Sequence, residues 1–382
     1  MDKIVKLDER IDSANAEKIE YCIRESLGDF KEDNIILDAS NLTYISSAGL
    51  RIILRLKKEN ATTKVINCNA EVFDIFQTTG FTEMMEIEKA YRNIDITNCE
   101  KIGSGANGVV YKIDTDTIVK VYYDSNALDE IKAERELARK AFVMGIPTAI
   151  PYDVVKVDNA YGSVFELLDA KSFCKLIKAG YDIDKLAKES VDILNIMHST
   201  FLKENELPYK NEEALKWATF DLNYLDKKVG ERLLKLFNDI PKTLNLIHGD
   251  YHIKNIMKAK DENLLIDMDT LSVGHPIFEF AAIYAAYIGY SCVSTGVPSE
   301  FFGIKDSDCK EFYDLTMKYY FKDKSAKFIK DVENKAKIIC YARILRRQIK
   351  HFGIDDPSQK SAIEFCKKYL EENVFKVDKL YY

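Results

Sequence analysis

The sequence predicts two consecutive domains, an α/β domain over residues 1–92 and a larger α+β domain over residues 93–382. The length of 382 residues exceeds that of one ordinary compact core. Short buried-strand runs alternate with amphipathic stretches up to about residue 90, which is typical of an α/β unit. A different pattern, a glycine-rich β-hairpin followed by a helix, begins near residue 96. Its start alone places the boundary, because no Pro- or Ser-rich linker precedes it.

The composition excludes several classes of protein. The 55 basic and 62 acidic residues give a net charge of −7, which argues against a nucleic-acid-binding surface. Eight cysteines are scattered singly without a C-x-x-C pair, as is typical of reduced thiols in a cytosolic protein. No secretory signal is visible, and the longest apolar stretch, residues 278–290, is shorter than the ~20 residues of a membrane helix. We therefore expect a cytoplasmic protein that contacts neither nucleic acid nor membrane.

The first domain reads as strands and helices in alternation. An alternating start is followed by an amphipathic stretch over residues 15–27 and a buried-strand run over residues 35–38. Apolar residues at near-helical spacing predict a helix over residues 51–59. A short strand over residues 65–68 and a short helix over residues 72–77 complete a compact α/β unit.

Two serines, Ser46 and Ser47, stand just before the predicted central helix of this domain. Serine is a favoured N-cap residue, so either side chain is well placed to cap the helix. Together with Asp38, the string SSAGL over residues 46–50 resembles the STAS domain of anti-sigma-factor antagonists. That resemblance covers about residues 1–90 and implies that Ser47 is a phosphorylation site and that the domain has a protein partner. A cap and a phosphorylation site remain alternative roles for Ser47.

A glycine-rich string, GSGANGVV, opens the second domain. Glycine-rich turns are common, but here β-branched residues follow over residues 109–113, then a turn and a second strand over residues 117–122. We interpret this as a β-hairpin with glycines at its tip, in contrast to the helix of a dinucleotide-binding fold. Backbone N–H groups can then approach nucleotide phosphates, and a lysine on the second strand can neutralise their charge. The candidate phosphate-binding residues are Gly103, Ser104, Gly105, Gly108 and Lys120.

The strongest signal is the string HGDYHIKN over residues 248–255, followed by LLIDMD over residues 264–269. The spacing makes chemical sense, because a carboxylate that accepts the proton of a nucleophile must sit close to the metal ligands but not on the metal. Asn255 follows Asp250 by five residues, and oxygen ligands from Asn and Asp suit Mg²⁺.

This H-G-D-x-H-x-x-N string with its downstream Ile-Asp pair resembles the signature of the aminoglycoside phosphotransferase and choline-kinase-like superfamily, over about residues 96–380. The resemblance implies a bilobal protein-kinase-like fold, with an N-lobe over about residues 93–168 and a C-lobe over about residues 169–382. It also implies a nucleoside triphosphate, ATP or GTP, as phosphoryl donor and Mg²⁺ as cofactor.

The resemblance assigns roles within these strings. Asp250 orients the substrate hydroxyl and accepts its proton, and Asn255 and Asp267 hold Mg²⁺. His248 and His252 brace the loop. A zinc site on the two histidines is an alternative, since they stand four residues apart. The glycine between them breaks helical geometry, and the glutamate of the H-E-x-x-H motif is missing, which argues against it.

Two further nucleotide contacts are expected from the same resemblance. In the predicted helix over residues 129–142, Glu134 is the expected ion-pair partner of Lys120, although a solvated helix charge is an alternative. The apolar strand that ends near residue 168 resembles the hinge whose backbone groups bind the nucleotide base, which makes Glu166 and Leu168 candidate contacts. A plain core strand would look the same.

The acceptor is expected to be a small molecule. The H-R-D, D-F-G and A-P-E motifs of protein kinases are missing. Only eleven residues separate Asp267 from Glu279, which leaves no room for a peptide-docking activation loop. Glu279 stands where related small-molecule kinases carry Asp, and we expect a structural role for it.

Long helices are expected over residues 310–321, 326–351 and 358–374, where they close the substrate cleft. Acidic residues there can meet a cationic substrate or form solvated helix faces. These residues are Asp306, Asp308, Glu311 and Asp314.

These observations favour a Mg²⁺-dependent kinase that phosphorylates a hydroxyl of an aminoglycoside-, choline- or sugar-like molecule, with a regulatory domain ahead of it. A signalling kinase that phosphorylates a STAS serine or a protein partner is the alternative. A third interpretation, a silent nucleotide-binding scaffold, is disfavoured by the full set of polar residues: Lys120, Glu134, Asp250, Asn255 and Asp267.

Overall fold

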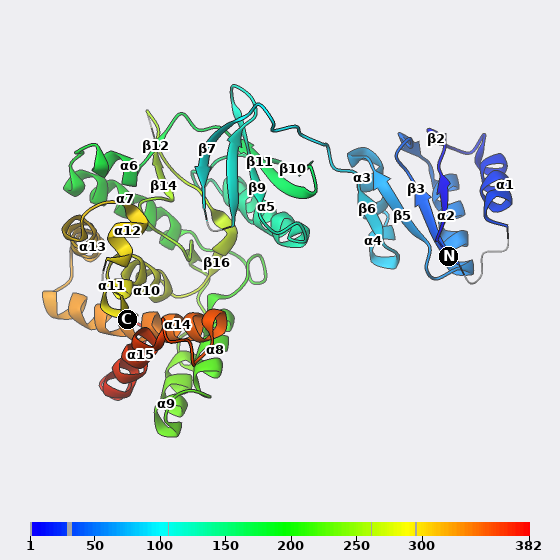
Figure 1. Cartoon of the computed structure of the whole chain (residues 1–382). Coiled ribbons are helices and arrows are strands. Elements are labelled where there is room, and N and C mark those ends of the chain that lie inside the picture. The colour runs from blue at the N-terminus through cyan, green and yellow to red at the C-terminus, as the bar shows by residue number, and fades with distance from the viewer. Residues whose placement is uncertain (1, 29–32, 106, 261, 295) are drawn as a thin grey trace. The chain divides into compact units, whose positions relative to one another are not determined.

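The computed structural model describes residues 2–28, 33–105, 107–260, 262–294 and 296–382. Its contacts divide the chain into two compact units, and Figure 1 labels most of their helices and strands. The first unit comprises residues 1–98 and 154–162, and the second comprises residues 99–153 and 163–382. Ala106, a member of the glycine-rich string, lies outside the described residues.

The first unit is built on a four-stranded parallel sheet of order β1-β3-β5-β6. The inward residues of its central strands, Ile35, Leu37 and Val65, are fully buried and share one core with apolar residues of α1, α2 and α3. The predicted helices and strands are present, with ends shifted by one or two residues for most of them. The elements are β1 (Asp2–Lys6), β2 (Arg10–Ile11), α1 (Ala16–Leu27), β3 (Asn34–Asp38), β4 (Tyr44–Ile45), α2 (Ser47–Glu59), β5 (Lys64–Cys68), α3 (Ala70–Thr78), α4 (Phe81–Met84) and β6 (Ile87–Lys89).

A five-stranded sheet of order β10-β11-β9-β8-β7 follows in the chain. Strands β7, β8 and β9 are antiparallel neighbours, and the helix α5 comes directly after β9. The glycine-rich string lies between β7 and β8, so the expectation that it forms the tip of the hairpin of β8 and β9 is wrong. That hairpin turns at the opposite end of β8. The elements are β7 (Glu100–Ser104), β8 (Gly108–Lys112), β9 (Thr117–Tyr122), α5 (Leu128–Val143), β10 (Pro151–Val157) and β11 (Ala160–Glu166).

The rest of the second unit is mainly helical, with short strands that carry the polar strings. The elements up to the second string are β12 (Lys171–Ser172), α6 (Phe173–Lys178), α7 (Ile183–Ser199), α8 (Lys210–Asp221), α9 (Lys227–Asn238), β13 (Leu246–Ile247), β14 (Ile256–Lys258), β15 (Asn263–Leu265) and the 3₁₀ turn η1 (Met268–Thr270). The remaining elements are β16 (Ser272–Val273), α10 (Ile277–Tyr284), the π-helix η2 (Ala285–Gly289), α11 (Tyr290–Val293), α12 (Val297–Phe302), α13 (Asp306–Tyr320), α14 (Ala326–Phe352) and α15 (Lys360–Asn373).

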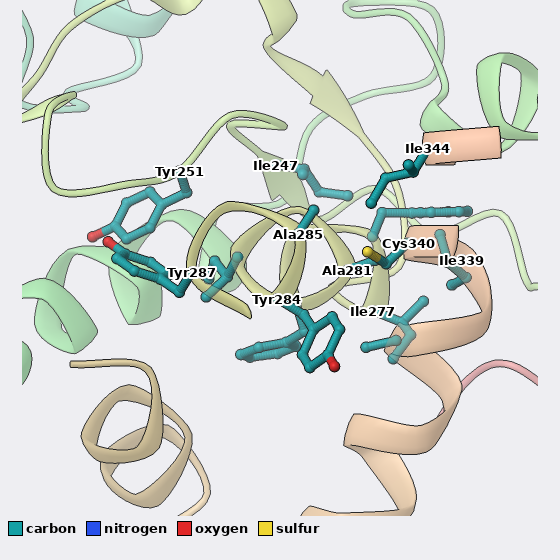
Figure 2. Close-up of a cluster of buried hydrophobic side chains, with 14 of the residues drawn as sticks. Ile247, Tyr251, Ile277, Ala281, Tyr284, Ala285, Tyr287, Ile339, Cys340 and Ile344 are labelled. Atoms are coloured by element: carbon teal, nitrogen blue, oxygen red, sulfur yellow. The ribbon is translucent and has the colours of Figure 1, made fainter. Parts of the chain in front are cut away.

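The core of this helical part forms where α10 and η2 pack against α14. Figure 2 shows Ile339, Cys340 and Ile344 of α14 beside the apolar side chains of α10. Tyr251, from the loop between β13 and β14, and Tyr287 of η2 belong to the same buried cluster. The loop that carries the HGDYHIKN string is therefore anchored to the largest core of the molecule.

Candidate active site

Lys120, on β9, lies between two carboxylates. Its Nζ is 2.8 Å from Glu134 Oε1 on α5 and 3.0 Å from Asp267 Oδ1, just after β15. Glu134 is buried, and its Oε2 accepts a hydrogen bond from the Tyr122 hydroxyl at 2.7 Å. Burial opposes the charge on Lys120, but Asp267 and Glu134 outweigh this and raise the pKa of the ammonium group. The expected Lys120–Glu134 ion pair is present, and it holds the cation beside Asp267.

A second acidic residue of the IDMD string joins this cluster. The carboxylate oxygens of Glu134, Asp267 and Asp269 lie within 4.8 Å of one another. Burial, followed by the charges of Asp267 and Glu134, raises the pKa of Asp269 to about 7. Because Mg²⁺ prefers oxygen ligands, this donor set fits the cation. The sequence prediction names Asp267 and misses Asp269, although a carboxylate two residues further on was a visible signal.

Asp250 lies in the loop between β13 and β14, which we call the HGD loop (residues 248–255). Its side chain is 44% exposed, and Oδ2 is 3.4 Å from His252 Nε2. Asn255 Nδ2 donates a hydrogen bond to the Asp250 carbonyl oxygen at 3.0 Å. Burial raises the pKa of Asp250, but the two histidines of the loop and Arg343 outweigh this and lower it to about 2. Asp250 is thus ionised at neutral pH and can accept a hydrogen bond from a hydroxyl group.

Glu279, on α10, binds the backbone at the start of the HGD loop. The side chain is fully buried, and its oxygens accept hydrogen bonds from the backbone N–H groups of His248 at 2.7 Å and Gly249 at 3.0 Å. Gly249 has φ 84°, and a Cβ atom there would lie 2.9 Å from the Thr270 carbonyl oxygen. Only glycine fits such a position without strain. The structural role expected for Glu279 is therefore that of an acceptor for two loop N–H groups.

Further hydrogen bonds hold the rest of the HGD loop. His248 Nε2 is 3.2 Å from the Ile266 carbonyl oxygen, and its Nδ1 accepts a hydrogen bond from the Asp250 N–H group at 3.3 Å. The Ile253 N–H group donates to the Tyr287 hydroxyl at 2.9 Å. Both ring nitrogens of His248 are thus engaged within the protein. Among the described residues, the group suited to a metal ion contains neither loop histidine, so nothing supports the zinc alternative.

The glycine-rich turn leads directly to the carboxylate cluster. The Gly105 N–H group donates to the Gly108 carbonyl oxygen at 2.9 Å. A Cβ atom on Gly108 would lie 2.2 Å from the Val121 carbonyl oxygen. Only glycine at this position therefore allows β8 to lie this close to β9. A cavity of about 480 Å³ opens beside the turn, and Asn107, Glu134 and Asp269 are among the residues that line it. Gly103 and Ser104 form the end of β7.

The candidate hinge residues follow at the end of β11. The Glu166 N–H group donates to the Ile150 carbonyl oxygen at 3.0 Å, and the Leu167 N–H group donates to the Asp116 carbonyl oxygen at 2.8 Å. Glu166 Oε2 also accepts a hydrogen bond from the Ile150 N–H group at 3.2 Å. The N–H groups of both residues are thus engaged within the protein, and Leu168 remains the better candidate for a contact to a nucleotide base.

In the first unit, the two serines take different positions. Ser46 is the N-cap of α2, and its hydroxyl accepts a hydrogen bond from the Ala48 N–H group at 3.2 Å. Ser47 is the first residue of the helix and is exposed. Its hydroxyl group makes no hydrogen bond to any residue that the structure describes. The cap role therefore belongs to Ser46, and Ser47 presents its hydroxyl group to solvent.

The fold and the side chains around Lys120, Asp250 and Asp267 define a kinase-like phosphotransferase that follows an α/β domain. Residues 98–292 match the family model of the phosphotransferase enzyme family, and the chain belongs to that family. Residues 2–95 match the STAS domain. Both resemblances inferred from the sequence are confirmed.

The chain is also similar to individual proteins and solved structures. Over 81 residues the chain is 32% identical to BtrV of Bordetella bronchiseptica, a candidate anti-sigma factor antagonist; the match covers 20% of this chain and 69% of that protein. The structure of the aminoglycoside phosphotransferase APH(2'')-Ib with ADP is 18% identical, covers 79% of this chain and 97% of its own, and has a TM-score of 0.49. A choline/ethanolamine kinase family protein from Mesorhizobium loti is 12% identical, with coverage of 73% and 88% and a TM-score of 0.47.

Within the part of the chain that the structure describes, no helix is both long and apolar enough to cross a membrane.

Proposed function

We propose that the second unit transfers the γ-phosphoryl group of a nucleoside triphosphate, ATP or GTP, to a hydroxyl group of a small molecule. The observation that carries this proposal is the contact of one ammonium group, Lys120, with Glu134 and Asp267. This contact connects β9, which carries Lys120, to the IDMD string, which carries Asp267. Phosphate-binding and metal-binding groups must meet in this way for phosphoryl transfer.

Different residues of the chain perform the separate parts of phosphoryl transfer. Asp250 accepts the proton of the acceptor hydroxyl as its oxygen bonds to the γ-phosphorus, while the bond from phosphorus to the β–γ bridging oxygen breaks and the nucleoside diphosphate leaves. Lys120 neutralises phosphate charge. Asp267 and Asp269 would hold Mg²⁺, together with Asn255 if its side chain turns. When bound by these residues, Mg²⁺ would supply positive charge to the phosphate oxygens. The glycine-rich turn covers the phosphates, and Leu168 contacts the base.

A screen of a metabolite mixture tests this function. The full chain, Mg²⁺ and ATP or GTP are incubated with the mixture, and a mass gain of one phosphoryl group on a small molecule is the expected result. Lys120→Ala should raise the KM for the nucleotide or lower kcat, because a phosphate contact is lost. Lys132→Ala, on the exposed side of α5, is the control. Equal nucleotide parameters for Lys120→Ala and the parent would contradict the phosphate-binding role.

A signalling kinase is the second candidate function. The exposed hydroxyl of Ser47 at the start of α2 favours it, since a phosphoryl group can reach this side chain from solvent. In that case the STAS domain would bind a protein partner under control of Ser47. Incorporation of labelled phosphate into protein, lost in Ser47→Ala, would identify this activity. Label found on small molecules alone would exclude it.

A further inference from the structure

The helix α14 carries a cluster of basic residues, Arg343, Arg346 and Arg347. Arg343 and Arg347 are four residues apart and so lie on one face of the helix. Among the residues that the structure describes, no carboxylate lies within ion-pair distance of any of the three. On a protein with a net charge of −7, this positive face can attract a negatively charged ligand.

Aromatic rings hold the two guanidinium groups of this face. Arg343 Cζ lies 5.6 Å from the centre of the Trp217 ring on α8, and Arg347 Cζ lies 5.9 Å from the centre of the Tyr290 ring at the start of α11. Contacts with the face of a ring fix a guanidinium group without using its N–H groups. None of those N–H groups donates a hydrogen bond to a described residue, so they remain available to a ligand.

The basic face belongs to the surroundings of Asp250. Arg343 lies beside the Trp217 ring of α8, and the same ring contacts Lys210. Lys210, also 5.6 Å from the centre of the Trp217 ring, has its Nζ 3.2 Å from the place where a Cβ atom on Gly249 would lie. Lys210 is paired with Glu213, whereas Arg343 is not paired. These groups come from α8 and α14, not from the strand that carries Lys120.

We propose that Arg343 and Arg347 bind an oxyanion of the acceptor, a phosphate monoester or a carboxylate, while Asp250 receives the hydroxyl group that is phosphorylated. The inference rests on the proposed function and narrows its substrate class. A planar guanidinium group binds two oxygens of such a group at once. An amine-bearing acceptor would place like charges together, which is unfavourable.

The acidic residues expected to meet a cationic acceptor do not oppose this inference. All four lie on the first three turns of α13, a helix that packs against α7. Asp314 is paired with Lys310, and Asp306 and Glu311 are exposed, as solvated helix residues are. Within the described part of the chain, none of the four forms a hydrogen bond or ion pair with a residue of the HGD loop.

Acceptors of three charge classes test the inference. The full chain with Mg²⁺ and γ-labelled ATP is offered sugar phosphates and hydroxy acids, neutral sugars, and amino alcohols or aminoglycosides. We expect label on members of the anionic class, and comparison of phosphates with carboxylates identifies the preferred oxyanion. Label restricted to neutral or cationic compounds would overturn the inference while leaving the proposed function intact.

Variants of α14 locate the contact. Arg343→Gln and Arg347→Gln should each raise the KM for the anionic acceptor by about ten- to a hundredfold, with the KM for ATP unchanged. Arg343→Lys should restore part of the loss. Arg346→Gln is the matched control, since Arg346 is on the same turn but contacts neither ring. An equal effect of Arg346→Gln and Arg343→Gln would contradict a site formed by Arg343 and Arg347.

A binding measurement covers the case in which no tested compound is phosphorylated. With the nucleotide site saturated by Mg²⁺–ADP, inorganic phosphate should raise the melting temperature of the parent and of Arg346→Gln, and of neither Arg343→Gln nor Arg347→Gln. No shift in the parent would overturn the inference. Failure of the proposed function has a different signature: Mg²⁺–ADP itself would then leave the melting temperature unchanged.

Discussion

The HGD loop and the serine segment of the first unit (residues 46–50) are both short strings whose motifs predict chemistry, but they are held in different ways. Side chains from three other elements bind the HGD loop: buried Glu279 accepts hydrogen bonds from its backbone, buried Tyr287 accepts one from Ile253, and half-buried Thr270 donates one to His248. In the serine segment the only side-chain hydrogen bond among described residues is the local cap of Ser46. A loop that is fixed from several sides can position a reacting group, whereas a helix start with a free hydroxyl suits modification.

The largest effect is expected at the centre of the HGD loop. Asp250→Asn keeps the shape of the side chain but removes the proton acceptor, so turnover should fall by about 10²–10⁴-fold. Nucleotide affinity should change little, because Asp250 makes no contact with Lys120. Initial rates and ADP titration of the variant measure both quantities. Full turnover of the variant would show that Asp250 is not the proton acceptor, and that the HGD loop is not fixed in order to position it.

The support beneath the loop should give the next largest effect. Glu279→Gln replaces one of two acceptor oxygens with an amide that cannot accept from a backbone N–H group, so one buried donor loses its partner. We expect a loss of stability of about 1–3 kcal/mol and, because the HGD loop shifts, a kcat lower by roughly tenfold or more.

Glu333→Gln, in a half-buried ion-pair network with Lys330 and Lys337 on α14, is the control for Glu279→Gln. Chemical denaturation and kcat measured on both variants separate the two effects. A kcat that stays at the parent value despite lost stability would show that the HGD loop does not need Glu279 for its position. The hydrogen bonds from the HGD loop to Glu279 would then contribute to stability but not to turnover.

The motifs predicted the elements and many of the side chains, but not the contacts between distant segments. The glycine-rich and HGD strings, with the family resemblance that they carry, singled out Lys120, Glu134 and Asp250, because each of these signals is local in sequence. The position of the glycine-rich turn was wrong, since alternation alone does not tell which end of β8 bears it. Asp269 and the support by Tyr287 were missed. Their roles depend on which elements the tertiary fold brings together.

Asp221 is a second buried carboxylate of this unit and differs from Glu279 in its hydrogen bonds. Asp221, at the end of α8, is fully buried, and neither carboxylate oxygen has a partner among the described residues. Burial raises its pKa to about 8, whereas His198 and the loop N–H groups overcome burial and lower the pKa of Glu279. The hydrogen bonds and His198 thus favour the charged form of Glu279, whereas burial without hydrogen bonds favours the neutral form of Asp221.

Stability should therefore depend on pH through Asp221. The folded-state pKa is above the unfolded one, so its contribution is most favourable below about pH 4 and is lost as the pH rises toward 8. Relative to the parent, Asp221→Asn should gain about 1 kcal/mol of stability per pH unit across that window. Urea unfolding at several pH values measures the slope. A constant difference between variant and parent would mean that Asp221 is ionised in the folded protein.

The smallest effect is expected at Ser47. Because it is the first residue of α2, a negative charge there faces the positive end of the helix dipole, and Ser47→Asp should stabilise the first unit by about 0.3–1 kcal/mol. Ser46 keeps the cap in Ser47→Ala and in Ser47→Asp, so neither should unfold the domain. A phosphate group, with about −1.5 to −2 charge, would be tolerated for the same reason.

If Ser47 is a switch, Ser47→Ala and Ser47→Asp should differ in partner pull-down or in phosphotransfer rate, although both variants fold equally well. Ser46→Ala, which removes the cap and leaves Ser47 in place, is the matched control for a general weakening of α2. Identical pull-down and rates for Ser47→Ala, Ser47→Asp and the parent would leave the serine segment as a helix start only, and the regulatory role of the first unit would have to lie on another surface.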